Sequence, residues 1–212
     1  MGLNYQIRKC QREGCSLRYP VFESDHPSDG CPRCGGSTVL LYEGWIEREN
    51  HSVSPRRGIQ VEAILDNVRS AWNVGSMFRS ADAIGLKHLY LCGITSTPEN
   101  PRVAKTALGA ERIMPWSYHA DGVELACDLK AQGVNLWALE NQVEATEIFP
   151  GGYDLHERRT ILIVGNEISG VDPGLLEICD QVLRVPMRGV KRSLNAAVAF
   201  GIAAFMICMQ TR

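Results

Sequence analysis

The sequence predicts an α/β protein built on a parallel sheet and preceded by a small zinc-binding module. Three features support this fold class. Short apolar runs alternate with helical patterns from residue 59 onward, four of the eight cysteines cluster within the first 34 residues, and a polar stretch separates the two regions. Alternating strands and helices imply parallel strands whose two faces are both covered by helices.

Bulk composition limits the kinds of protein this can be. The 212 residues, 45% of them hydrophobic, suffice for one full-sized domain with a small module beside it. A formal net charge of -2 excludes a uniformly basic nucleic-acid coat, so any RNA contact must be local. Local basic clusters occur at Arg56 and Arg57, and at Arg184, Arg188, Lys191 and Arg192.

We expect a cytoplasmic protein without a membrane span. The chain starts without the charged and apolar pattern of a signal peptide. Its longest apolar run, residues 196–209, is shorter than the roughly 20 residues that a bilayer requires.

The first module carries a metal signature. Cys10 and Cys15 form a C-x4-C pair, and Cys31 and Cys34 form a C-x2-C pair that fifteen intervening residues separate from the first. Two such turns can close a tetrahedron of thiolates around zinc, and the turn after Cys34 can point amide hydrogens at the sulfurs. We expect a structural zinc ribbon, since four thiolates leave no open coordination position for redox or catalytic chemistry.

Alternatives to the cysteine quartet are weaker. His26 could serve as a ligand, but four cysteines suffice, and a cytoplasmic setting disfavours disulfides. The remaining cysteines, at positions 92, 127, 179 and 208, lie in apolar or helical contexts typical of small core residues. We place the zinc ribbon at residues 1–53, a linker at 54–58 and the second domain at 59–212.

Elements of the second domain follow from periodicity. Strands are expected at residues 61–65, 88–93, 135–139, 161–165 and 181–186, and helices at 73–84, from about 101, at 123–133 and at 193–210. The first helix carries a core stripe that ends at a glycine, formed by Val74, Met77, Phe78, Ala81, Ile84 and then Gly85.

Polar residues of this helix allow simple structural interpretations. Arg79 lies off the core stripe and could form an i,i+3 ion pair with Asp82. Asn73 could be the N-cap. The stretch ILIVGNEISGVDP runs from a strand into a loop through Gly165, a residue type that allows a ligand to approach the backbone closely.

Three segments together resemble the motifs of SPOUT-superfamily RNA methyltransferases of the SpoU (TrmH) type. They are NVRSAWNVGSMFRSADAIG, VGNEISGVDPGLLEICDQVLRVPM and RGVKRSLNAAVAFGIAAF. The resemblance covers residues 59 to 212 and matches the family motifs at Asn73, Arg79, Glu167, Ser193 and Asn195. Ala196 and Ala197 depart from the valine and serine of many members, and the zinc module is an unusual addition.

The resemblance implies a deep C-terminal trefoil knot that grips S-adenosylmethionine. The cofactor would be held through Gly165, Val185 and Leu194, with Met187 and Asn195 close by. Backbone groups of irregular loops suit adenine, since their amides and carbonyls are not engaged in a ladder.

The reaction implied is methyl transfer to a ribose 2′-hydroxyl of tRNA or rRNA. Arg79 would act at the attacking oxygen, as general base or as positioner, although arginine stays protonated above pH 12. Asn73 would orient Arg79 or the ribose, and Glu167 would order its loop. Ser193 and Asn195 would cap the last helix and shape the cofactor pocket.

Partners follow partly from charge and partly from the resemblance. Arg102, Lys105, Arg112 and Arg188 could track an RNA backbone or be solvated surface charges. The last helix is apolar all round, and family members form homodimers through the knot region, so we expect a homodimer.

Other functions remain open at this level. The alternatives are a catalytically silent RNA-binding or ribosome-assembly protein and a base methyltransferase on the same scaffold. A nucleotide-binding oxidoreductase is disfavoured because no G-x-G-x-x-G turn follows the first strand.

Overall fold

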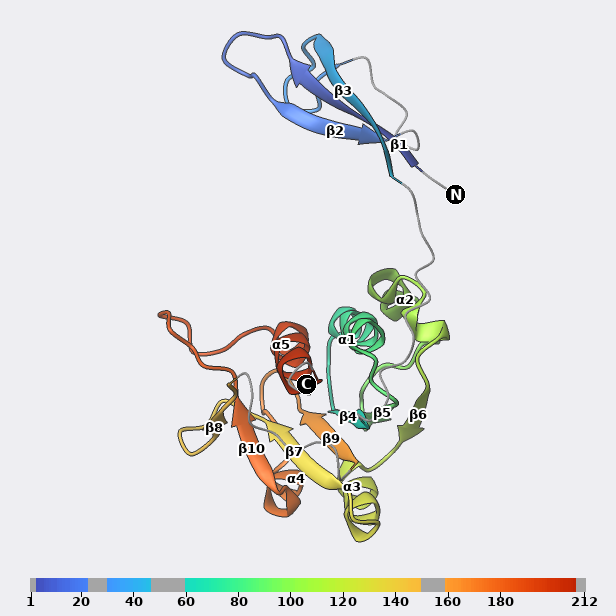
Figure 1. Ribbon diagram of the computed structural model, residues 1–212, viewed down its shortest axis with the longest axis vertical. Coiled ribbons are helices and arrows are strands. Elements are labelled where there is room, and N and C mark those ends of the chain that lie inside the picture. The colour runs from blue at the N-terminus through green and yellow to red at the C-terminus, as the bar shows by residue number, and fades with distance from the viewer. Residues whose placement is uncertain (1–2, 23–29, 47–59, 150–158, 209–212) are drawn as a thin grey trace. The chain divides into compact units, whose positions relative to one another are not determined.

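The computed structural model describes residues 3–22, 30–46, 60–149 and 159–208. The chain divides into two compact units, Met1–Ser54 and Pro55–Arg212 (Figure 1). The linker expected at 54–58 lies outside the described residues, so the domain limits stay a prediction.

The N-terminal unit is a three-stranded antiparallel sheet in the order β2-β1-β3. Its strands are β1 (Leu3–Cys10), β2 (Arg18–Phe22) and β3 (Thr38–Ile46). Among its described residues, only Cys10 and Cys31 are buried. A sheet with so small a core needs another source of stability, and a bound metal is the usual one in small domains.

The C-terminal unit contains a seven-stranded sheet whose pairings are all parallel, in the order β6-β5-β4-β9-β7-β10-β8. Its strands are β4 (Val61–Asp66), β5 (Leu89–Cys92), β6 (Trp116–His119), β7 (Asn135–Leu139), β8 (Thr146–Glu147), β9 (Thr160–Val164) and β10 (Gln181–Arg184). Every residue of β4 and β9 is buried, which explains why both strands are mainly apolar. The predicted parallel α/β class is confirmed.

Helices cover both faces of this sheet. They are α1 (Ala71–Ile84), α2 (Pro101–Ala107), α3 (Gly122–Ala131), α4 (Pro173–Ile178) and α5 (Ala196–Cys208), with a 3-10 turn η1 (Ala110–Arg112). Helices α1, α2 and α5 pack on one face, and α3 and α4 pack on the other (Figure 1). No helix in the described part of the chain is long and apolar enough to cross a membrane.

Helix α1 starts earlier than its periodicity suggests. Ser70 is the N-cap, and its side chain accepts a hydrogen bond from the Asn73 N–H. The expected start at Asn73, and with it the N-cap role of Asn73, is therefore wrong. The core stripe is confirmed up to Ala81, Ile84 packs at its edge, and Gly85 ends the helix in the left-handed region at φ 86°.

The connection from β7 to β8 has an unusual path. The two strands lie on opposite sides of β10, although only residues 140–145 join them. The chain must therefore cross the line of β10 close to the carboxyl end of that strand. This crossing is compatible with the expected knot, which itself stays a prediction.

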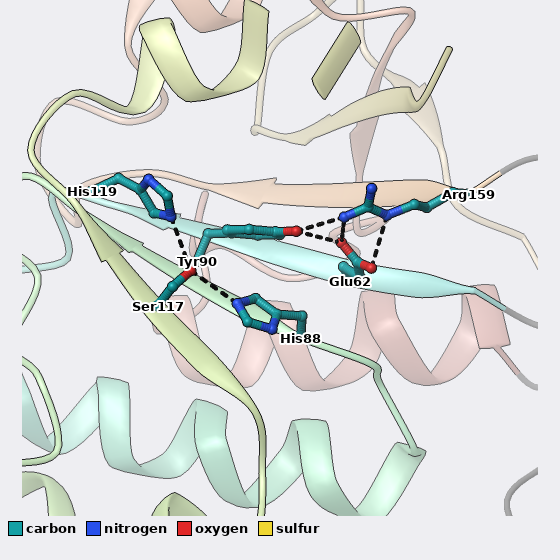
Figure 2. Close-up of polar contacts among 6 residues, drawn as sticks. All are labelled: Glu62, His88, Tyr90, Ser117, His119 and Arg159. Atoms are coloured by element: carbon teal, nitrogen blue, oxygen red, sulfur yellow. Dashed lines mark hydrogen bonds and ion pairs between the residues drawn. The ribbon is translucent and has the colours of Figure 1, made fainter. Parts of the chain in front are cut away.

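A buried carboxylate joins the amino-terminal ends of β4 and β9. Glu62, only 8% exposed, accepts hydrogen bonds from both Nε and Nη2 of Arg159, at 2.8 and 2.6 Å, and from the Tyr90 hydroxyl at 3.0 Å (Figure 2). Burial, and then the neighbouring carboxylate, raises the pKa of Tyr90 to about 12. A buried charge is tolerated when it is paired and hydrogen-bonded in this way.

The same polar cluster extends to the edge strand. The Ser117 hydroxyl lies 2.9 Å from Nε2 of both His88 and His119, and Tyr90 stands beside the two imidazoles (Figure 2). Burial lowers the pKa of His88. The cluster satisfies polar groups across β4, β5 and β6 and so stabilises this half of the sheet.

Close packing of α1 on α2 depends on Gly75. A Cβ at this position would overlap the Thr106 hydroxyl and the Val103 carbonyl oxygen, whereas a Cβ at Gly201 in α5 would lie at an ordinary 3.5 Å from Ser80.

We predict that Gly75→Ala lowers the free energy of unfolding by about 1–3 kcal/mol, because the overlap outweighs the helix propensity of alanine. Gly201→Ala, the matched control, should raise it by about 0.5–1 kcal/mol. Urea unfolding measures both, and stabilisation by Gly75→Ala would contradict the packing argument.

Candidate functional site

A cavity of about 460 Å³ opens at the carboxyl ends of β7, β9 and β10. Its lining comes from residues at 139–141, 164–170, 184–187 and 192–199. The carboxyl ends of parallel strands are the usual place for a ligand in such sheets.

The loop after β9 forms one wall and is tightly ordered. Asn166 and Gly170 exchange two backbone hydrogen bonds of 2.9 Å, and the Asn166 side chain accepts from the N–H groups of Ile168 and Ser169. A Cβ at Gly165 would overlap the backbone at Gly170 and Val171. The sequence suggests that this glycine allows the close approach of a ligand. The packing of the loop's own backbone already requires a residue without a Cβ at this position.

Glu140 was missed by sequence reasoning and ties β7 to this loop. Its Oε2 accepts a hydrogen bond of 2.9 Å from the Val171 N–H, and its Oε1 accepts one from the Asn141 N–H. Gly170, at φ 78°, leaves room for the carboxylate. The only signal in the sequence was an acidic residue directly after an apolar strand.

The residues expected to hold a cofactor all line the cavity: Gly165, Val185, Met187, Leu194 and Asn195. Among the residues expected to be catalytic, Glu167 and Ser193 line it too, whereas Asn73 and Arg79 do not.

Glu167 is the centre of a hydrogen-bond network between three separate segments. Its carboxylate accepts from the N–H groups of Arg69 (2.8 Å) and Ser70 (3.1 Å) and from Asn73 Nδ2 (2.8 Å). Asn195 Nδ2 in turn donates to Asn73 Oδ1 at 3.0 Å. The network therefore joins the loop after β9, the start of α1 and the start of α5, and it places a carboxylate at a helix N-terminus, where it is stabilised.

The network also fixes the ionisation of Glu167. Partial burial would raise the pKa of this carboxyl, but the Arg69 N–H, the Asn73 side chain and the Ser70 N–H outweigh it, so the pKa is lowered. Glu167 is therefore a carboxylate at neutral pH and a weak base.

Asn195 caps α5, and Ser193 does not. The Asn195 side chain accepts hydrogen bonds from the N–H groups of Ala197 (2.9 Å) and Val198 (3.3 Å). Ser193 is exposed and makes no hydrogen bond within the described residues. The expectation that both residues cap the helix is wrong for Ser193. This residue lies two positions before the capping residue Asn195, too far from the first turn of α5 to cap it.

Arg79 lies about 9 Å along α1 from Asn73, at 1.5 Å per residue. Its side chain is exposed and forms no ion pair with Asp82 or with any other described residue. The i,i+3 ion pair considered from the sequence is therefore wrong. The guanidinium group is available for an anionic ligand.

Arg184 has one polar group that is satisfied and one that is not, within the described residues. Its Nη2 pairs with Glu147 at 2.9 Å, while its buried Nε has no hydrogen-bond acceptor among the described residues. Arg184 lines the cavity beside apolar Leu139, Val164 and Val185. Such a lining suits a ligand that carries both an apolar part and a hydrogen-bond acceptor.

The basic residues expected to meet RNA are all exposed: Arg102 and Lys105 on α2, Arg112 in η1 and Arg188 after β10. Arg112 lies 3.5 Å from Glu111, so it is partly neutralised. Lys105 Nζ lies 5.9 Å from the ring centroid of Trp72.

Trp72 is a second residue that the sequence did not single out. It directly precedes Asn73 on α1 and is 46% exposed. Large aromatic side chains are usually buried, so an exposed ring next to a cation is a candidate contact surface. Both groups favour nucleic-acid ligands.

The four cysteines of the N-terminal unit come together as expected. Their Sγ atoms all lie within 4.8 Å of one another, with Cys10 and Cys34 at 3.5 Å and Cys15 and Cys31 at 3.8 Å. A tetrahedral zinc with bonds of about 2.3 Å separates its sulfurs by about 3.8 Å, so the quartet fits this metal.

Backbone amides support the quartet. The Arg12 N–H donates to the Cys10 sulfur at 3.4 Å, and the Gly36 N–H, followed by the neighbouring thiols, lowers the pKa of Cys34 to about 7. His26, the alternative ligand, lies outside the described residues. Of the other cysteines, those at positions 92 and 208 are buried, whereas Cys127 is exposed on α3, contrary to expectation.

Fold and site together define an α/β protein with a parallel sheet and a ligand cavity formed by loops at its carboxyl edge. Residues 60–205 match the model of the SpoU rRNA Methylase family. The chain belongs to this family, as the motifs of the sequence predicted.

Relatives and solved structures agree with this assignment. The chain is 32% identical over 163 residues to the 23S rRNA (guanosine-2'-O-)-methyltransferase RlmB of Xanthomonas axonopodis pv. citri (strain 306), covering 76% of this chain but only 64% of that relative. The A. aeolicus TrmH/SpoU tRNA modifying enzyme superposes with a TM-score of 0.64 at 25% identity, covering 74% of this chain and 77% of that one. An AdoMet-bound rRNA methyltransferase from Sinorhizobium meliloti superposes with a TM-score of 0.63 at 27% identity. The match covers 77% of this chain and 62% of that one.

The lowered pKa of Glu167 predicts a pH dependence of stability. Because the pKa is lower in the folded than in the unfolded chain, the ionised carboxylate stabilises the fold above its unfolded value of about 4.3. This contribution disappears as the pH falls through the folded pKa. We expect the free energy of unfolding to fall less steeply below pH 4.3 in Glu167→Gln than in the wild type, measured by urea unfolding at a series of pH values. If the free energy of unfolding fell equally steeply in both proteins, the Glu167 carboxylate would not stabilise the fold.

Zinc loading is tested by elemental analysis. Purified protein should contain about one zinc per chain, and Cys31→Ser should lose most of it, because three thiolates bind less tightly than four. Cys127→Ser, the matched control on α3, should keep the full amount. Full zinc in Cys31→Ser would rule out the quartet.

Proposed function

We propose that this chain transfers a methyl group from S-adenosylmethionine to a ribose 2′-hydroxyl of rRNA or tRNA. The observation that carries the proposal is the contact of Asn195 with Asn73 and of Asn73 with Glu167 beside the cavity. Three family motifs that are far apart in the sequence meet there. A relative named as an rRNA guanosine-2'-O-methyltransferase supports ribose as the acceptor.

S-adenosylmethionine fits the cavity. Gly165, Val185 and Leu194 line it, and the buried Nε of Arg184, which has no acceptor among the described residues, could donate to an acceptor of the ligand. The AdoMet-bound relative from Sinorhizobium meliloti supports the same ligand here. When bound, the cofactor supplies an electrophilic methyl group.

The protein's own contribution to the chemistry is mainly positioning. None of the side chains that line the described cavity is a histidine, lysine or cysteine, and Glu167 is a weakened base. The Arg79 guanidinium offers hydrogen-bond donors and no acceptor, which suits it to holding anions. We therefore assign Arg79 to holding the ribose and its phosphate in line with the methyl group, because alignment alone is a source of large rate effects. The hydroxyl proton would leave to solvent water as the new bond forms.

RNA would approach across α1 and α2. Trp72 and Lys105 offer a stacking surface and a cation next to Asn73, and Arg102, Arg112 and Arg188 offer contacts to phosphates. The choice between rRNA and tRNA follows from how this surface and the N-terminal unit fit the target.

A homodimer completes the proposal. Arg79 does not line the cavity of its own chain, and α5 exposes Val198, Ile202 and Phe205 at 49, 36 and 52%. A second copy, meeting the first through the expected knot region, would cover apolar surface of this kind. We place the protein in the cytoplasm, where the cysteine thiols stay reduced.

Transfer of labelled methyl from S-adenosylmethionine to total RNA, from cells that lack the protein, tests the function. We expect label in 2′-O-methylnucleosides, and a decrease of about a hundredfold in Arg79→Ala, because the acceptor loses its alignment. Asp82→Ala on the same helix is the control and should match the wild type.

Two results would overturn the proposal in different ways. Label in nucleobases after nuclease digestion would indicate a base methyltransferase. Wild-type protein that binds the cofactor but transfers nothing would indicate an RNA-binding or ribosome-assembly protein.

A further inference from the structure

We propose that one face of the N-terminal sheet binds the bases and phosphates of single-stranded RNA. This stacking face consists of Tyr5, Lys9, Arg18, Phe22 and Tyr42. The inference rests on the proposed RNA substrate and assigns to the zinc ribbon a defined binding surface.

Three aromatic side chains gather at one end of the face. The Tyr5 ring lies 6.5 Å from Phe22 and 6.0 Å from Tyr42, with interplanar angles of 42° and 48°. Opposite Tyr5 stands Gly44, where any Cβ would overlap the tyrosine ring. The glycine lets Tyr5 extend across β3 toward Tyr42, which remains 54% exposed.

Two cations lie at the other end of the same face. Lys9 is directly opposite Arg18, and the register between β1 and β2 runs unbroken from this pair to the pair of Tyr5 and Phe22. Because side chains four residues apart on a strand point to the same side, the cations share the face of the aromatic rings, about 13 Å away along the strand.

The pair of cations is unfavourable unless an anion joins it. Like charges directly opposite each other destabilise a sheet. Lys9 and Arg18 are exposed, and neither has an ion pair or side-chain hydrogen bond among the described residues. Glu43 is the sole acidic residue within the three strands, and it accepts a hydrogen bond from Gln6 on the opposite face.

Aromatic rings and cations that share one face of a sheet favour single-stranded nucleic acid. Unpaired bases can stack on exposed rings while Lys and Arg follow the backbone, and this combination needs no particular sequence. A duplex hides the faces of its bases, and an apolar protein partner would leave both cations unpaired. The face therefore suits an unpaired loop or strand of the RNA that is to be methylated.

The opposite face offers matched controls. Trp45 is 60% exposed but lies beside Glu43, and Arg8 donates hydrogen bonds to Thr38 and Gln6. Each control residue resembles one on the stacking face in size or charge, yet lies on the other side of the same sheet.

The experiment measures binding of a fluorescent single-stranded oligouridine of about twelve nucleotides to the full-length, zinc-loaded protein. We expect Tyr42→Ala to weaken binding about tenfold, and Tyr42→Phe and Trp45→Ala to bind like the wild type. The double variant Lys9→Gln, Arg18→Gln should lower the slope of log affinity against log salt by about 1.4, because each phosphate contact contributes about 0.7. Arg8→Gln should leave that slope unchanged.

The outcomes separate this inference from the proposed function. Raised KM for RNA with unchanged kcat and unchanged cofactor binding in Tyr42→Ala supports it. The inference is overturned if the wild-type protein does not bind the oligonucleotide, even when methyl transfer is intact. It is also overturned if the variants of the stacking face bind the oligonucleotide as tightly as the wild type. A change of oligomeric state in Tyr42→Ala without loss of RNA affinity would instead show an interface between copies.

Discussion

The carboxylate of Glu167 is the interaction on which the candidate site depends. It accepts hydrogen bonds from the N–H groups of Arg69 and Ser70 before α1 and from the side chain of Asn73. The Asn73 side chain in turn accepts a hydrogen bond from Asn195. The loop after β9, the start of α1 and the start of α5 thus share one charged centre. Because those amides lack partners within the helix, the carboxylate both satisfies them and fixes where the helix begins. Without it, the cavity would lose the alignment of its walls.

The two ends of the parallel sheet are organised in opposite ways. At the amino-terminal end, the buried Glu62 is satisfied by Arg159 and Tyr90, and no ligand is needed there (Figure 2). At the carboxyl end, the buried Nε of Arg184 has no acceptor among the residues that the structure describes. An unsatisfied buried donor costs free energy unless a ligand accepts its hydrogen bond. This asymmetry favours the cavity, rather than the larger polar cluster, as the candidate functional site.

How much the sequence could predict depended on the range of the interactions involved. The fully buried strands β4 and β9, the core stripe of α1 and the cysteine quartet have strong local patterns, and all were predicted correctly. The short strands β6 and β8 and the helix α4 were missed, because each has six residues or fewer and is held by partners distant in sequence. Glu140 carries only a weak local signal, an acidic residue directly after an apolar strand, and Trp72 carries none, since their roles follow from what the fold places beside them.

The ionisation states of the site point to a mechanism based on geometry. A general base works best when its pKa lies near the working pH, yet the pKa of Glu167 is lowered, and a guanidinium such as that of Arg79 offers donors but no acceptor. Raising the pKa of Glu167 would require removing the amides that order the loop, so the protein cannot have both an ordered wall and a strong base at this position. A reaction that starts from an already activated methyl donor needs chiefly alignment of donor and acceptor. The network is therefore suited to methyl transfer because it favours rigidity over basicity.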